Sequence, residues 1–189
     1  RLKGLASVPE ERNGHAAVPD FTLWDNSVLT VRDRLGLALS GFIQPKAARK
    51  YTGEVISAFA VKATGADATA GSLSGGNLQK YIMGREILQK PGALVVSQST
   101  WGVDAGAAAA IHQALVDLAS SGSAIIVISQ DLDELLSLCD TIAVINGGRL
   151  SKPMQVSEAD INEIGLLMGG IHGDAEATAR IEEAHHHAA

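Results

Sequence analysis

The sequence predicts an α/β fold, in which a parallel sheet is flanked by helices and joined to a separate helical segment. Residues 92–96 and 124–128 are short, unbroken apolar runs bounded by turn residues, which is typical of strands buried in a parallel sheet. The stretch between them repeats its apolar residues at helical spacing. A strand, a helix and a second strand form a crossover unit, whose two strands pair in parallel. Helical patterns also dominate residues 21–72.

The first half of the chain is predicted to contain one short strand and two helices. The strand lies at Leu5–Val8 and is followed by a polar, turn-rich loop. The first helix has Asp20 or Thr22 as its candidate N-cap. The second begins at Pro45, which suits a first turn because an N–H group there would have no partner, and its pattern continues to Lys62.

The second half alternates helices and strands. A small, polar loop at residues 65–72 leads into it, and the apolar residues that follow keep helical spacing as far as Leu88. After the crossover unit the elements become shorter. They are a helix at Leu132–Leu138, a strand at Thr141–Ile145, a Gly147-Gly148 turn and a tail helix near residues 158–168.

The composition is that of a globular chain that can bury a core, with 46% apolar and 19% charged residues, and we expect one domain. The formal net charge is −6 and no basic stripe is present, which argues against nucleic acid as a main partner. No apolar run reaches the roughly 18 residues that a membrane span needs, and no signal peptide is visible. The single Cys139 excludes an internal disulfide framework. These features predict a cytoplasmic setting.

Residues 171–189 are predicted to form a flexible tail. Three consecutive histidines, 185–187, fit a solvated tail better than a metal site, because no other cluster of ligands accompanies them. No metal site is therefore predicted.

The octapeptide LSGGNLQK at residues 73–80 is the most informative motif. Ser74 stands where a helix N-cap is expected, and Gly75 and Gly76 follow it. The first N–H groups of a helix lack internal partners, the helix dipole is positive there, and glycines let the backbone come close to a ligand. A nucleotide phosphate is the natural candidate. Taken alone, the pattern is more often an ordinary capped turn, worth about 0.5–2 kcal/mol of helix stability.

LSGGNLQK resembles the signature motif of ATP-binding-cassette (ABC) ATPases, in the form found in importers of simple sugars and nucleosides. The segments that follow, GREILQKPGALVV and TWGVDAGA, keep the family's order of signature helix, Walker B strand and D-loop. The resemblance covers about residues 4–170 and implies part of a P-loop NTPase-type parallel sheet with an α-helical subdomain. It divides the chain into a strand and loop at 1–20, a helical subdomain at 21–72, the signature helix and the rest of the ATPase core at 73–170, and a tail at 171–189.

The printed sequence contains no G-x-x-x-x-G-K-[ST] P-loop, whose amides and lysine hold nucleotide phosphates. In ABC cassettes the P-loop and the Q-loop precede the helical subdomain, so the resemblance implies a cassette truncated before its signature half. Double-cassette importers often carry a weakened second cassette, and QSTWGVDAGA is similar to the nucleoside branch. We therefore expect a C-terminal, second nucleotide-binding cassette.

Three positions that carry chemistry in the family hold neutral residues here. The family's Walker B strand ends in Asp-Glu, for Mg²⁺ and for the attacking water, whereas this chain has Ser97 and Gln98. Gln130 stands where family members often place a histidine. Glutamine cannot act as a general base, and positioned proton transfer is typically worth about 10²–10⁴ in rate. The resemblance thus implies a degenerate Walker B site without an intact catalytic residue.

In this family two cassettes pair head to tail, and each ATP lies between the P-loop of one cassette and the signature of the other. Asp104 of the D-loop would lie at the seam near the partner's site, or would cap the following helix, or would do both. By the same resemblance, the residues that would face the γ-phosphate of an ATP bound in trans are Ser74, Gly75, Gly76, Asn77 and Gln79.

The resemblance implies the ATP-binding subunit of an ABC importer for simple sugars or nucleosides, with ATP and Mg²⁺ as cofactors. Its partners would be an N-terminal cassette of the same protein or a second copy, transmembrane permease subunits and, indirectly, a solute-binding protein. It would lie at the cytoplasmic face of the membrane and hydrolyse ATP only in the assembled transporter, the isolated chain being inactive. One alternative stays open, a non-catalytic cassette for dimerisation or regulation. An unrelated α/β domain with a fortuitous LSGG turn has little to support it.

Overall fold

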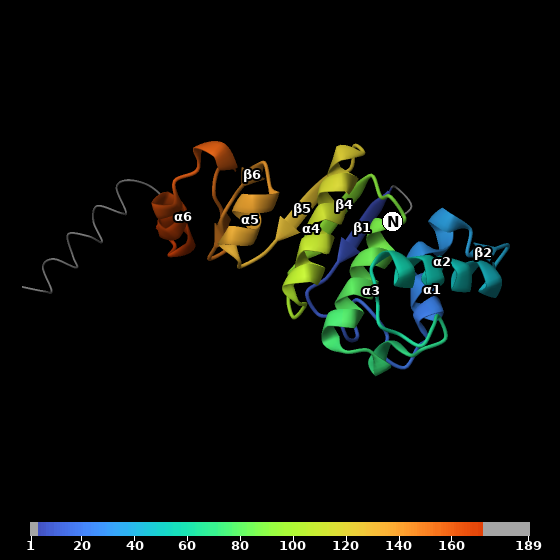
Figure 1. Ribbon diagram of the computed structural model, residues 1–189. Coiled ribbons are helices and arrows are strands. Elements are labelled where there is room, and N and C mark those ends of the chain that lie inside the picture. Colours follow the sequence, from blue (N-terminus) through green and yellow to red (C-terminus); the bar gives the residue numbers. More distant parts are fainter. Residues whose placement is uncertain (1–3, 172–189) are drawn as a thin grey trace, which may run out of the picture. The chain divides into compact units, whose positions relative to one another are not determined.

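The computed structural model describes residues 4–171 of the chain. Contacts separate the described part of the chain into two compact units, divided after Gln130, where the composition suggested one domain. Figure 1 shows the helices and strands of each unit. The three consecutive histidines of the predicted tail lie outside the described residues.

The first unit contains a parallel sheet of three strands. The strands are β1 (Leu5–Val8), β4 (Ala93–Ser97) and β5 (Ala124–Ile128), in the order β1-β4-β5. β4 pairs in parallel with both neighbours, and helix α4 (Ala105–Ser120) forms the crossover between β4 and β5. The predicted α/β fold with a parallel sheet and flanking helices is therefore confirmed.

Helix α3 (Gly75–Ile87) connects this sheet to the helical part of the unit (Figure 1). It packs against β1 and α4, and also against α1 (Leu23–Leu35) and α2 (Pro45–Ala58). A small antiparallel hairpin, β2 (Ala38–Leu39) and β3 (Phe42–Ile43), lies between α1 and α2. The helix that follows the LSGG turn is thus the element that the sheet and the helical part share.

Local sequence determines where these helices begin and end. Thr22 caps α1, as predicted, because its side chain accepts a hydrogen bond from a first-turn N–H. α2 begins at Pro45 as predicted but ends at Ala58, earlier than its pattern suggested. Phe59 then leaves the helix and packs against Gly84 of α3, where a β-carbon would lie only 2.5 Å from the Phe59 ring. The missing side chain at Gly84 therefore lets the chain pack closely there.

The predicted burial holds for β4 but not for β5. Leu94 and Val96 of β4 are buried, whereas Ile126 and Ile128 of β5 are 60% and 52% exposed. β5 is an edge strand of the sheet that residues 4–171 form, and within these residues nothing covers Ile126 and Ile128. The unbroken apolar run predicted the strand correctly and its burial wrongly.

The second unit packs around three buried residues, Ile142, Val144 and Ile164. Its elements are the helices α5 (Leu132–Leu138) and α6 (Ile161–Met168), the strands β6 (Thr141–Ile142), β7 (Ile145–Asn146), β8 (Arg149–Leu150) and β9 (Met154–Gln155), and a 3₁₀ turn at Val156–Glu158. None of the helices that the structure describes, in either unit, is long and apolar enough to cross a membrane.

The strand predicted at Thr141–Ile145 is split into two short strands. β6 pairs with β9, whereas β7 pairs with β8, so the apolar run serves two different partners. Gly147 and Gly148 turn the chain from β7 into β8 with φ angles of 54° and 78°, which glycine adopts without steric cost. The predicted glycine turn is confirmed, and the continuous strand before it is wrong.

Candidate functional site

Ser74 occupies the N-cap position of α3, as predicted, but its side chain does not cap the helix. Its Oγ instead accepts a hydrogen bond from Nδ2 of Asn77 at 2.9 Å. The cap residues of α1, α4, α5 and α6 all accept backbone N–H groups through their side chains. The first turn of α3 therefore lacks this side-chain bond, and an anion can take the place of the missing cap.

This open turn gathers several hydrogen-bond donors. The first bond within it runs from the Leu78 N–H to the Ser74 carbonyl oxygen, so the N–H groups of Gly75, Gly76 and Asn77 precede the intrahelical ladder. The Ser74 oxygen accepts from Asn77, which leaves its own O–H group as a donor. Backbone amides and a hydroxyl at the positive end of a helix dipole suit a phosphate group.

Asn77 also holds the segment after α2 against the turn. Its Oδ1 accepts a hydrogen bond from the backbone N–H of Lys62 at 2.9 Å, while its Nδ2 donates to Ser74. One side chain thus fixes both the Ser74 hydroxyl and the backbone of Lys62. Nothing in the sequence marked Lys62, because it precedes the octapeptide by a loop.

A pocket of about 330 Å³ lies at this turn. Four of the predicted site residues line it together, and two lysines with one aspartate give its lining a net positive charge. Neither lysine is among the predicted site residues, although Lys80 is the last residue of the octapeptide motif. The lining residues are Lys62, Ser74, Gly76, Asn77, Lys80, Gly102 and Asp104.

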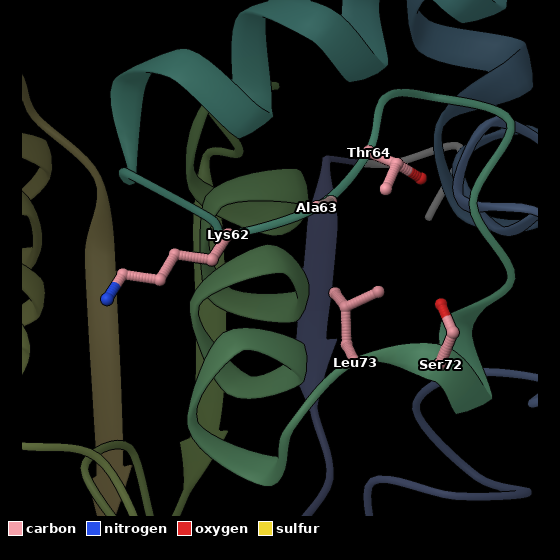
Figure 2. Close-up of a pocket in the computed structure, with 5 residues that line it drawn as sticks. All are labelled: Lys62, Ala63, Thr64, Ser72 and Leu73. Carbon is pink, nitrogen blue, oxygen red and sulfur yellow. The ribbon is translucent and has the colours of Figure 1, made fainter.

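A second hollow, of about 500 Å³, shares Lys62 with this pocket. Figure 2 shows Ser72 and Leu73 directed toward the loop that carries Ala63 and Thr64, while Lys62 extends away from them. Ser72 ends the 3₁₀ turn that precedes the signature. The hollow beside the first turn of α3 is therefore lined by both hydroxyl groups, from Thr64 and Ser72, and an aliphatic side chain, from Leu73.

Glycines allow the D-loop to approach the signature turn. A β-carbon on Gly76 would lie 3.0 Å from the Gly102 carbonyl oxygen, which is closer than ordinary van der Waals contact. Gly102 itself has a φ of 69°, in the left-handed region that favours glycine. A side chain at position 76 would therefore press against the D-loop, and a side chain at position 102 would strain the backbone.

Asp104 is the N-cap of α4, and its Oδ1 accepts a hydrogen bond from the Ala107 N–H at 3.0 Å. This hydrogen bond is the main cause that holds the pKa of Asp104 below its ordinary value, and the charge of Lys80 lowers the pKa further. The capping role that the sequence left open is therefore present. The same residue lines the pocket, so the two roles are compatible.

Gln79 lies inside the first unit, with 2% of its surface exposed. Its Nε2 donates to the carbonyl oxygens of Ser99 at 3.0 Å and of Gln98 at 3.3 Å. The expectation that Gln79 faces a phosphate is not met in this structure, because its amide is used to tie α3 to the loop after β4. Gln79 thus bonds α3 to the loop after β4.

Ser97, Gln98 and Gln130 lie at the carboxyl ends of β4 and β5, apart from the residues that line the pocket. Ser97 is paired with Ile128, and the Gln98 N–H donates to the Ile128 carbonyl oxygen at 2.8 Å. Gln98 has a φ of 55°, which is uncommon outside glycine. Open α/β sheets bind ligands beyond this edge. The predicted site residues therefore form two sets, one at the signature turn and one at the strand ends.

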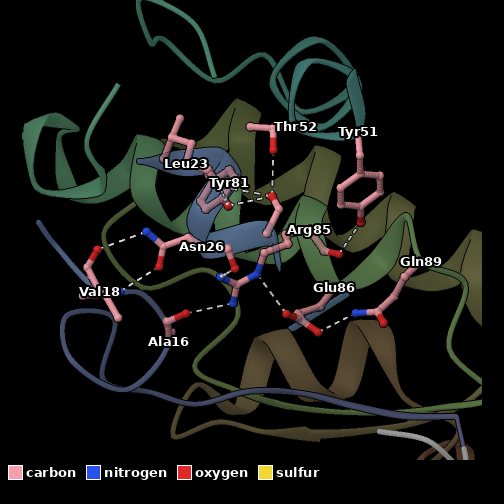
Figure 3. Close-up of polar contacts among 11 residues, drawn as sticks. Ala16, Val18, Leu23, Asn26, Tyr51, Thr52, Tyr81, Arg85, Glu86 and Gln89 are labelled. Carbon is pink, nitrogen blue, oxygen red and sulfur yellow. Dashed lines mark hydrogen bonds and ion pairs between the residues drawn. The ribbon is translucent and has the colours of Figure 1, made fainter. Parts of the chain in front are cut away.

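A buried polar network bonds α3 to neighbouring segments, as Figure 3 shows. Arg85 and Glu86 are 1% and 0% exposed, and Nε of Arg85 donates to Oε1 of Glu86 at 2.9 Å. The Arg85 Nη atoms donate to the carbonyl oxygens of Ala16 at 2.8 Å and Asn26 at 3.2 Å, and Gln89 donates to Oε2 of Glu86 at 2.6 Å. The network bonds α3 to α1 and to the loop after β1.

Hydroxyl groups extend this network into the helical part of the unit (Figure 3). Oγ of Ser27 lies 2.8 Å from Oγ1 of Thr52 and 2.9 Å from the hydroxyl of Tyr81, which also donates to the Leu23 carbonyl oxygen. Burial raises the pKa of Tyr81, which therefore stays protonated as a donor. No local motif predicts these contacts, because the partners are 25 to 58 residues apart.

No protein-family model matches the chain. Among curated proteins, it is 38% identical over 180 residues to a glucose import ATP-binding protein of Haloferax volcanii, covering 93% of this chain and 32% of the relative. It is 36% identical over 168 residues to a nucleoside import ATP-binding protein of Lactococcus lactis, covering 89% and 33%. A ribose import ATP-binding protein of Rubrobacter xylanophilus is 32% identical over 180 residues, covering 95% and 34%.

Among solved structures, the chain is similar in fold to ATP-binding cassettes. A dimeric ATP-binding cassette in a post-hydrolysis state, bound to ADP and phosphate, matches with a TM-score of 0.68 at 20% identity, covering 82% of this chain and 64% of that one. The chain is a homologue of ABC import ATP-binding proteins. The family resemblance expected from LSGGNLQK is confirmed, and this chain has the fold of an ABC cassette. It spans about a third of the length of the curated relatives that it matches.

Proposed function

We propose that this chain is the ATP-binding part of an ABC importer for simple sugars or nucleosides, and that its signature turn contacts the γ-phosphate of an ATP held by a partner cassette. The observation that carries the proposal is the pocket in which Ser74, Gly76 and Asn77 lie beside Asp104. These groups form a single wall, so an ATP placed there needs a second wall from another cassette. The glucose, nucleoside and ribose importers among the relatives supply the substrate class.

The groups of the signature pocket fit a phosphate in charge and in hydrogen bonding. The first turn of α3 has no side-chain cap, and its dipole favours an anion by about 0.3–1 kcal/mol at an exposed site. Lys62 and Lys80 add two positive charges, against the single carboxylate of Asp104. ATP therefore fits the described residues through its phosphates.

Hydrolysis of that ATP depends, in this proposal, on carboxylates of the partner cassette. At the strand ends of this chain Ser97 and Gln98 are neutral, so neither side chain can accept a proton from water at neutral pH. Within residues 4–171 no group of three His, Cys, Asp or Glu side chains could hold a metal ion. Mg²⁺ would enter with the ATP phosphates, and this chain's own nucleotide site would turn over slowly.

Coupling to transport would pass through the helical part of the first unit. The Arg85 and Tyr81 networks bond α3 to α1, so a movement of the signature turn displaces α1 as well. We propose that permease subunits contact this part at the cytoplasmic face of the membrane, and that a solute-binding protein acts through them. A purely regulatory cassette is the weaker candidate, because the relatives are import ATP-binding proteins.

A charge-reversing substitution in the signature turn tests the proposal. Gly76→Asp puts a carboxylate at the phosphate position and a β-carbon against the Gly102 carbonyl oxygen. In the complete ATP-binding protein assembled with its permeases, we expect ATPase activity to fall about 10²-fold, as it does when one transition-state donor is lost. Gly165→Asp is the matched control, since Gly165 lies on the surface of α6 in the second unit with open space around it. Full activity in Gly76→Asp would contradict the proposal.

A further inference from the structure

Arg12 connects the loop after β1 to the signature turn. Its Nη1 donates a hydrogen bond to the carbonyl oxygen of Gly75, the first residue of α3, at 2.8 Å. The two residues are 63 positions apart in the chain. The VPEER stretch that contains Arg12 is thus a direct neighbour of the LSGG turn in space.

The guanidinium group fits between two glycines. A β-carbon on Gly75 would lie 3.0 Å from Nη1 of Arg12, and one on Gly102 would lie 3.2 Å from Nη2. Gly75 belongs to the signature turn and Gly102 to the D-loop. Arg12 therefore contacts both loops that line the pocket, from the side on which glycines leave room for its planar fork.

The loop that carries Arg12 is itself fixed. The Ala17 N–H donates to the Arg12 carbonyl oxygen at 2.8 Å, and the Ala16 carbonyl oxygen accepts from the buried Arg85 at 2.8 Å. Figure 3 shows Val18 of the same loop in two hydrogen bonds with Asn26, of 2.8 Å and 3.0 Å. The loop is thus bonded to the first residue of α3 through Arg12 and to its last turn through Arg85.

The charge of Arg12 opposes the dipole of α3. A cation beside the first turn of a helix is unfavourable, because that end already carries positive partial charge. Together with Lys62 and Lys80 it makes three cations near one open turn, against the single Asp104 of the pocket. An arrangement selected for stability alone would place an anion there, whereas this arrangement suits a phosphate bound in front of the turn.

We propose that Arg12 is a positioning residue that holds the signature turn and the D-loop in the arrangement in which they face the γ-phosphate of ATP. The inference rests on the proposed function and adds to it a residue outside the signature motif. Arg12 does not line the pocket, so it acts through Gly75 and Gly102 rather than on the phosphate itself.

ATPase kinetics of the complete ATP-binding protein, assembled with its permeases, test this role. We expect Arg12→Gln to lower kcat about tenfold or more, because a displacement of about 1 Å in positioned groups costs up to 10²-fold. KM for ATP should change less than about threefold, since the P-loop contacts of the partner are untouched. Arg12→Lys keeps the charge and one donor, and should recover part of the lost kcat. Arg149→Gln, which removes an exposed arginine of β8 in the second unit, is the control.

Amide hydrogen exchange in the 189-residue chain separates positioning from general stability. In Arg12→Gln we expect faster exchange at Gly75, Gly76 and Gly102, with Tyr81 to Ile87 unchanged. An unchanged kcat, or faster exchange along the whole of α3, overturns the positioning role. If Gly76→Asp leaves ATPase activity intact while Arg12→Gln lowers it, the proposed signature function fails and Arg12 acts in some other way. If Gly76→Asp abolishes activity and Arg12→Gln does not, only the role of Arg12 fails.

Discussion

Ser74 illustrates how one hydrogen bond changes what a residue can do. Ser-Gly-Gly before a helix predicts a capped turn, and the serine does lie at the cap position. Its oxygen is taken by Asn77, however, so the first amides of α3 stay available to a ligand. The identity and position of Ser74 could be predicted from the sequence. The diversion of its hydroxyl could not, because an asparagine three residues later is compatible with either arrangement.

At the strand ends, restoring the acidic pair tests whether the neutral residues limit turnover. In the complete protein, the double substitution Ser97→Asp with Gln98→Glu supplies a carboxylate for Mg²⁺ and a base for water. We expect ATPase activity at this site to rise, by up to about 10²-fold if proton transfer is limiting. Rates are measured in the assembled importer, and Ser97→Ala with Gln98→Ala serves as the control. If this control abolishes activity while Gly75→Asp is harmless, the strand-end residues carry the catalysis and the signature turn does not, which contradicts the roles assigned here.

Asp104 gives a pH dependence whose sign follows from its cap. Its pKa in the folded chain lies below the ordinary value of 3.8, so the ionised carboxylate stabilises the fold above that pH. This contribution is lost as the pH falls through the folded pKa. We expect thermal unfolding midpoints to drop more for the parent than for Asp104→Asn between about pH 5 and about pH 2, since asparagine caps without a charge. Parallel curves would show that the capping charge contributes nothing.

At the scale of elements, α3 is held by a charge pair that has no access to water. Glu86→Gln keeps the shape of the side chain but leaves Arg85 without its countercharge inside the first unit. Breaking a buried pair in this way costs about 3–5 kcal/mol of unfolding free energy. Urea unfolding measures it, and Glu54→Gln is the control because its pair with Lys50 is exposed and worth at most about 1 kcal/mol. A loss below about 1 kcal/mol in Glu86→Gln would mean that the network does not stabilise α3.

Periodicity predicted the elements of the sheet well and their surroundings less well. The strands at Leu5–Val8 and Ala124–Ile128 have the predicted bounds. For Ala124–Ile128 the reason is that an unbroken apolar run between turn residues leaves few other structures. The same pattern cannot say which face is covered, so the exposure of Ile126 and Ile128 was missed. It also cannot detect a change of pairing partner, which divides the strand predicted at Thr141–Ile145.

At the scale of the whole molecule, contacts between distant segments account for what the sequence missed. Two residues from other parts of the chain, Lys62 and Arg12, are hydrogen-bonded to the first turn of α3. Arg85 lies on α3 itself and bonds it to the loop after β1. Such contacts follow from tertiary packing, which no local motif encodes. The domain division at residues 1–20, 21–72 and 73–170 stays a prediction, while contacts place the boundary between compact units after Gln130.

The central claim is that the signature turn serves an ATP whose other wall belongs to a partner cassette. Titration of the 189-residue chain with ATP, followed by NMR at individual backbone amides, tests it most directly. We predict chemical-shift changes at the amides of Gly75, Gly76 and Lys80, with a Kd of about 1 mM or weaker. This Kd corresponds to a binding free energy no more favourable than about −4 kcal/mol, because one wall supplies few contacts. Micromolar affinity, or shifts confined to Ser97 and Gln98 with none at the signature turn, would contradict the account.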